Sequence, residues 1–75
     1  MRIIIKEDGK IRLKEVLEVV IGKTGNLVAR EPGIGMKTRE FLTGDKAEEL
    51  FYQIFTDGYA DLSGFESHLV RYDDV

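Results

Sequence analysis

Apolar residues open the chain in a short β-branched run, Ile3 to Ile5, which is typical of a strand from Arg2 to Lys6. Asp8-Gly9 follows, and a second apolar segment begins at Ile11. Because both residues of an Asp-Gly pair can adopt positive φ, the pair favours a two-residue hairpin turn. The pattern therefore predicts an N-terminal β-hairpin.

The run from Ile11 to Ile21 fits two periodicities. As a strand, its odd-numbered positions are apolar except at Glu15. As a helix, apolar residues fall at i, i+3, i+4, i+7 and i+8 from Leu13, and Gly22 would end it. The β-branched content favours a strand with a bulge near Glu15, and the helix remains the alternative.

Gly22-Lys23-Thr24 matches the end of a nucleotide-binding phosphate loop, G-x-x-x-x-G-K-[ST]. The position that needs the first glycine holds Leu17, and Gly25-Asn26 makes a turn where the motif needs a helix. We therefore expect a loop between the strands "VLEVVI" and "LVARE". The segment "PGIGMKT" lacks the third glycine of a dinucleotide fingerprint, so it also predicts a turn. Neither segment predicts a nucleotide site.

The second half begins with "MKTREFL", which we interpret as a strand, and continues into the clearest helix pattern. Asp45 and Glu48 resemble a capping box, and Gly58 predicts the helix end. Five apolar residues at helical spacing predict one buried stripe: Ala47, Leu50, Phe51, Ile54 and Phe55. In the tail, Ser63-x-x-Glu66 predicts a second short helix, with a strand through "HLVRY" as the alternative.

These elements predict an α+β fold: a small antiparallel sheet of three to four strands, with one or two C-terminal helices on one face. The 75 residues suit a single domain, residues 1–75. There is no cysteine and one histidine, His68, so a metal site or nucleophilic catalysis has little material, and we interpret His68 as a surface or boundary residue. We expect a cytoplasmic, non-enzymatic protein with no cofactor, no metal and no membrane segment.

Charge divides the chain. Residues 1–39 hold nine Lys or Arg against five Asp or Glu, a balance of +4, and residues 40–75 hold two against nine, a balance of −7. Such asymmetry indicates an electrostatic partner. The acidic half predicts a partner-binding face with tyrosines as anchors, made of Asp45, Glu48, Glu49, Tyr52, Asp57, Tyr59 and Asp61. The basic half offers an alternative nucleic-acid face through Arg12, Lys14 and Lys37.

The order of the hairpin "IIIKEDGKIRLK", further strands, "TREFLTGDKAEELFYQIF" and a short second helix resembles that of some very small phage-borne anti-CRISPR proteins. This resemblance lies in topology, has no diagnostic motif and transfers no site residue. It implies a tiny cytosolic inhibitor that binds a CRISPR effector, often at its nucleic-acid-binding surface.

The leading hypothesis is a protein–protein interaction module, most concretely an inhibitor whose acidic helical face blocks a basic surface of its partner. Direct nucleic-acid binding is the alternative, which the acidic total charge of −3 disfavours. Because so small a core leaves sheet edges free, a homodimer is also considered.

Overall fold

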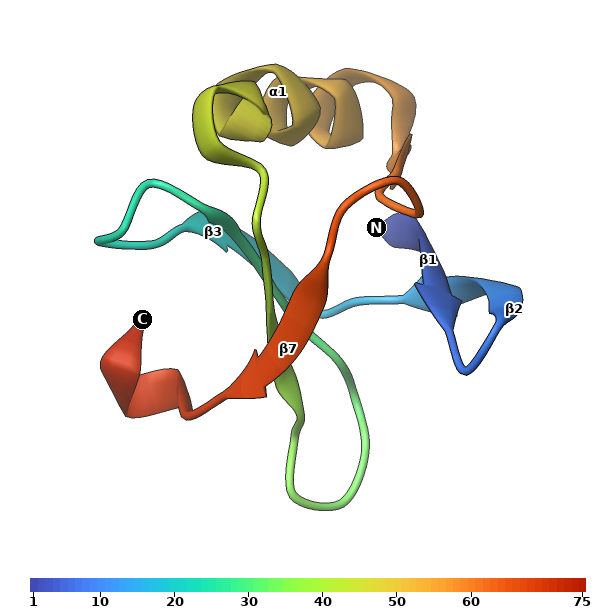
Figure 1. The fold of residues 1–75 in the computed structure, drawn as a ribbon, viewed down its shortest axis with the longest axis vertical. Coiled ribbons are helices and arrows are strands. Elements are labelled where there is room, and N and C mark those ends of the chain that lie inside the picture. Colours follow the sequence, from blue (N-terminus) through green and yellow to red (C-terminus); the bar gives the residue numbers. More distant parts are fainter.

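The computed structural model describes residues 1–75, and its regular structure consists of seven strands in two sheets and one α-helix (Figure 1). The fold is therefore α+β, as predicted. The elements in chain order are β1 (Arg2–Glu7), β2 (Lys10–Glu15), β3 (Glu18–Ile21), β4 (Leu27–Arg30), β5 (Thr38–Phe41), the 3₁₀ helix η1 (Gly44–Lys46), α1 (Ala47–Asp57), β6 (Tyr59–Asp61), β7 (Ser67–Val70) and the 3₁₀ helix η2 (Tyr72–Asp74).

The first sheet has the strand order β2-β1-β6. β1 and β2 form the predicted antiparallel hairpin, with Glu7 paired to Lys10 across the turn. Asp8 and Gly9 have φ values of 53° and 76°, so the turn uses the left-handed conformations that an Asp-Gly pair tolerates. β6 returns parallel to β1, which makes the sheet mixed where an antiparallel one was expected.

The second sheet is antiparallel throughout, in the order β3-β4-β5-β7. The strand interpretation of the run from Ile11 to Ile21 is confirmed, but the run forms two strands, β2 and β3, in different sheets. Val16 donates its amide hydrogen to the carbonyl of Met1, and Leu17 donates to Arg30. The chain thus changes its hydrogen-bonding partner within two residues, and a crossing between sheets takes the place of the predicted bulge.

The prediction of a second helix in the tail is wrong. The alternative, a strand in this segment, is correct, and the strand is β7 (Ser67–Val70). β7 pairs with β5, with Thr38 opposite Val70. Ser63 does not cap a helix. Its amide and hydroxyl both donate to the Asp61 carboxylate, at 2.9 and 2.6 Å, and the segment that follows it is paired as a strand. The open edge of β5 then offers the following segment a full ladder of backbone hydrogen bonds.

The helix begins later than its sequence signals predict. α1 starts at Ala47 after η1, and no side chain caps either N-terminus, so the proposed capping box of Asp45 and Glu48 is wrong. The end of the helix is confirmed: Gly58 has φ 82° and donates its amide hydrogen to the carbonyl of Ile54 at 2.9 Å. Glycine supports this left-handed cap without steric cost.

One hydrophobic core lies between the two sheets and α1, which Figure 1 shows above the strands. Its largest fully buried side chains are Phe41, Ile3, Ile5, Leu27 and Leu62. The helix contributes Ala47 and Ile54, with Leu50 and Phe51 packed at the border.

Phe55, predicted to be the last residue of the buried stripe, is 80% exposed. Consecutive helix residues are about 100° apart, so Phe55 points well away from the buried Ile54. Ile54 therefore faces the core while Phe55 stays exposed to solvent.

The face of the second sheet that points away from the core is partly covered by the C-terminal residues. η2 lies there, and the Tyr72 ring receives the Arg30 guanidinium at 4.4 Å from its centroid. The Tyr72 hydroxyl also contacts Glu18 at 3.2 Å. The C-terminal residues thus pack on the outer face of this sheet, and Val28 beneath them is buried.

Candidate functional site

The outward side of α1 combines acidic and aromatic residues. Glu48, Tyr52 and Phe55 occupy positions i, i+4 and i+7, so they follow one line along the helix. Tyr52 is 61% exposed and Phe55 is 80% exposed. Glu49 lies next to this line and has a loose ion pair with Lys46 at 3.7 Å. Together with the exposed Asp45 of η1, these residues are called the helix face below: Asp45, Glu48, Glu49, Tyr52 and Phe55.

The Tyr52 ring is held in place although it is exposed. It meets the Phe51 ring edge to face, with centroids 5.6 Å apart. Phe51 in turn packs against the core. A ring that is already positioned loses little conformational freedom on binding, which makes it a good interface anchor.

The structure divides the predicted acidic face into two parts. Asp45, Glu48, Glu49 and Tyr52 lie on the helix face, whereas the other three residues lie at the end of α1 and in β6. Those three are Asp57, Tyr59 and Asp61. The side chains of Tyr59 and Asp61 alternate with the buried Ala60, so they point to the outer side of the first sheet.

Asp57 and Tyr59 border a hollow of about 620 Å³ on that sheet. Half of its lining residues are apolar, Met1, Ile4 and Leu13 among them. Asp61 is not part of the hollow. The hydrogen bonds from Ser63, first from its hydroxyl and then from its amide, hold the pKa of the Asp61 carboxyl below its ordinary value. This carboxylate therefore accepts the hydrogen bonds of the turn that follows β6.

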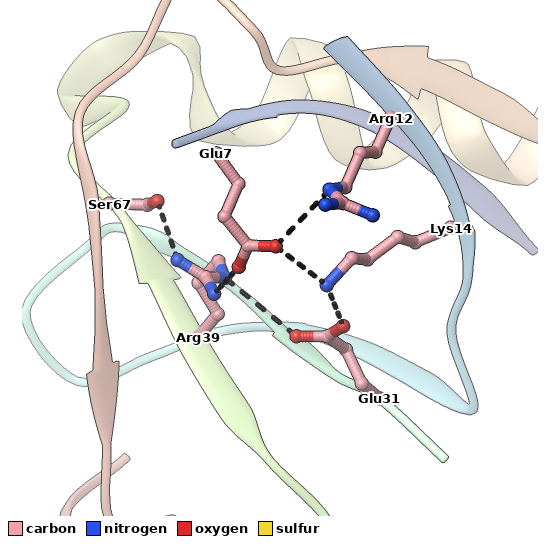
Figure 2. Close-up of polar contacts among 6 residues, drawn as sticks. All are labelled: Glu7, Arg12, Lys14, Glu31, Arg39 and Ser67. Carbon is pink, nitrogen blue, oxygen red and sulfur yellow. Dashed lines mark hydrogen bonds and ion pairs between the residues drawn. The ribbon is translucent and has the colours of Figure 1, made fainter. Parts of the chain in front are cut away.

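The three residues of the predicted basic face do not share one exposed surface. Figure 2 shows Arg12 and Lys14 pointing inward from β2 toward the carboxylate of Glu7. The distances to its Oε1 atom are 3.5 Å from Arg12 Nε and 3.4 Å from Lys14 Nζ. Lys37 is exposed in the loop before β5 and forms no ion pair.

The same network joins the two sheets (Figure 2). Arg39 of β5 contacts Glu7 at 2.7 Å and donates to the Ser67 hydroxyl at 3.2 Å. Glu31, which follows β4, contacts Lys14 at 2.9 Å and Arg39 at 3.7 Å. The side chains of Arg39 and Glu31 are only 11% and 9% exposed. The cationic side chains, Lys14 foremost, hold the pKa of the Glu7 carboxyl below its ordinary value.

A second polar cluster, which sequence reasoning missed, lies on the outer face of the second sheet. Glu40 accepts a hydrogen bond from the Thr24 hydroxyl at 2.7 Å and contacts His68 Nε2 at 3.0 Å. Thr24 lies in the loop between β3 and β4, as predicted for the segment that resembles a phosphate loop. No local sequence signal links these three residues, because register alone places Glu40 opposite His68.

The hydrogen bond from Thr24, followed by those from Asn26 and His68, holds the pKa of Glu40 below its ordinary value of 4.5. A carboxyl whose pKa is lowered by folding contributes stability above its unfolded-state pKa and loses it as the pH falls through the folded pKa. We therefore expect the free energy of unfolding to decrease as the pH falls below 4.5. Urea unfolding of wild type and Glu40→Gln at several pH values measures this.

In Glu40→Gln, the free energy of unfolding should decrease less steeply as the pH falls. Part of the decrease remains, because the pKa values of Glu7 and Asp61 are also lowered. Glu48→Gln, at an exposed position, is the matched control and should follow the wild type. An unchanged slope in Glu40→Gln would show that this carboxyl is not stabilised by folding.

No protein-family model, curated protein or solved structure matches this chain. No three His, Asp or Glu side chains are arranged to hold a metal ion. The single α-helix has eleven residues and is too short to cross a bilayer.

Proposed function

We propose that this chain is a non-catalytic interaction module that binds a basic surface of a partner protein through the helix face. The observation that carries the proposal is the exposure of Tyr52 and Phe55 among acidic residues. Phe55 gains little burial in the folded chain, so its ring contributes little to stability. Aromatic residues inside a polar rim are the usual composition of an interface core.

The two kinds of residue would have separate roles. Tyr52 and Phe55 supply apolar area, which mainly sets how slowly the complex dissociates. Glu48, Glu49 and Asp45 supply negative potential, which speeds the approach of a basic partner and makes association sensitive to salt. The complex expected from this face therefore associates faster at low ionic strength.

The most concrete form of the proposal is an inhibitor that covers a basic, nucleic-acid-binding surface. The resemblance to anti-CRISPR proteins included a short second helix, and β7 stands in its place. A CRISPR effector is therefore one partner to test among proteins with such a surface. The alternative of direct nucleic-acid binding has weaker support, because Arg12 and Lys14 are already paired with carboxylates.

A pull-down from host lysate, with and without nuclease, followed by kinetic binding to the partner identified, tests the proposal. We expect Phe55→Ala to weaken binding about tenfold or more, mostly through faster dissociation. Glu48→Lys/Glu49→Lys should mainly slow association. Asp73→Lys/Asp74→Lys makes the same charge change in η2 and is the matched control.

The control variant should associate faster than the helix variant. Equal loss in both would mean that only net charge matters, and wild-type binding in both helix-face variants would exclude this face. Capture that disappears with nuclease would move the assignment to nucleic acid.

A further inference from the structure

β2 is an edge strand with an unpaired side. It pairs only with β1, and five of its six residues are exposed. Val16, just beyond β2, donates its amide hydrogen to Met1 of the β1 side. Hydrogen-bonded pairs alternate in an antiparallel ladder, so Lys14, Arg12 and Lys10 bond to β1. The backbone groups of Ile11 and Leu13 therefore point away from the sheet and can accept another strand.

The side chains of this edge alternate between apolar and basic. On the outer side of the sheet, Ile11 and Leu13 are 63% and 61% exposed. Leu13 also borders the hollow described above. On the other side lie Lys10, Arg12 and Lys14, of which Lys10 is exposed and forms no ion pair. An added strand would meet Ile11 and Leu13 on one face. On the other face it would meet the free cation Lys10, next to Arg12 and Lys14, which are paired with Glu7 and Glu31.

A second copy of β2 fits this edge poorly. Residues opposed across an antiparallel pair lie on the same face of the sheet. If two copies pair antiparallel through the free groups of Ile11 and Leu13, Arg12 must face Lys10, Arg12 or Lys14 of the other copy. Like charges in direct opposition are destabilising, so the edge is protected against its own copies.

We propose that the β2 edge binds an extended segment of a partner protein in which acidic and apolar residues alternate. The segment adds a strand to the sheet, and the free backbone groups of Ile11 and Leu13 supply the main-chain hydrogen bonds. Its apolar side chains pack on Ile11 and Leu13, and its carboxylates lie beside Lys10, the exposed cation of this edge that forms no ion pair. This surface is separate from the helix face and does not depend on the function proposed for it.

Fluorescence polarisation with labelled peptides as long as β2 tests the proposal on the full chain. The probe alternates Glu and Val; one comparison peptide alternates Lys and Val, and another has the Glu and Val residues in blocks. We expect the alternating acidic peptide to bind about tenfold tighter than either comparison peptide, because only it matches both faces.

Leu13→Pro removes an outward amide without breaking a bond to β1, so it should abolish peptide binding while circular dichroism shows a folded chain. Lys10→Gln removes the charge of an exposed side chain that forms no ion pair and puts no second carboxylate opposite Glu7. It should weaken binding about threefold and decides alone if the proline variant unfolds. Three results would each overturn the proposal. The first is equal binding of all peptides, and the second is undiminished binding by a folded Leu13→Pro. The third is a dimer in sedimentation that Leu13→Pro dissociates.

Discussion

Phe41→Ala is expected to lower the free energy of unfolding by about 3 to 5 kcal/mol. Phe41 is 1% exposed and is among the largest fully buried side chains. Its removal forfeits the transfer free energy of the ring and leaves a cavity, because the sheets on either side cannot collapse around it. Domains of this size have only about 5 to 15 kcal/mol in total, so much of the stability would be lost. Urea unfolding followed by circular dichroism measures the change.

Phe55→Ala is the matched control, since it makes the same substitution at a residue that is 80% exposed. Its effect on unfolding should stay within about 0.5 kcal/mol. A large loss in Phe55→Ala would mean that this ring is buried in solution and would also remove the basis for the proposed helix face. The pair of variants thus tests the core and the interaction surface together.

The second large effect is expected from Glu31→Gln, which should cost about 3 kcal/mol. The substitution keeps the shape of the side chain but removes the charge that faces Lys14 at 2.9 Å and Arg39 at 3.7 Å. Because Glu31 and Arg39 are nearly buried, water cannot replace the lost carboxylate. In this variant, Glu7 is the only carboxylate left in the network to pair with Lys14 and Arg39.

Glu15→Gln serves as the control for this prediction. It also removes a carboxylate from an ion pair, with Arg2 at 3.1 Å, but both side chains are at least 60% exposed. The expected loss is below about 1 kcal/mol. The double variant Glu31→Gln/Arg39→Gln should lose less than the sum of its single variants, because the remaining partner is no longer a buried charge. Strict additivity, or equal losses in Glu31→Gln and Glu15→Gln, would contradict the role given to the network.

The two proposed surfaces use few of the residues that hold the fold together. The core and the ion-pair network occupy the space between the sheets, whereas Tyr52, Phe55, Ile11 and Leu13 are exposed. Variants at these exposed positions can therefore lose binding without unfolding the chain. Arg12 is the exception, since it contributes to both the network and the β2 edge.

The sequence alone determined the features that depend on neighbouring residues. Asp8-Gly9 specified the hairpin turn and Gly58 specified the helix end, because both depend on local φ angles. The apolar period of the helix predicted a buried stripe whose first four members are buried or partly buried. The sequence also predicted the exposure of the acidic helix residues, because they lie at helical spacing on the side opposite the apolar stripe.

Only the tertiary structure decided which distant segments meet. At Val16 and Leu17 the chain passes from one sheet to the other, since Val16 bonds to Met1 and Leu17 bonds to Arg30. The last strand, β7, forms where it can pair with the edge of β5. Phe55 is exposed although it continues the apolar spacing of the helix, because spacing does not say which side chains the rest of the fold covers. The pairing of Arg39 with Glu7 joins residues 32 positions apart. Such contacts depend on how strands are ordered and registered, and no local pattern encodes that order.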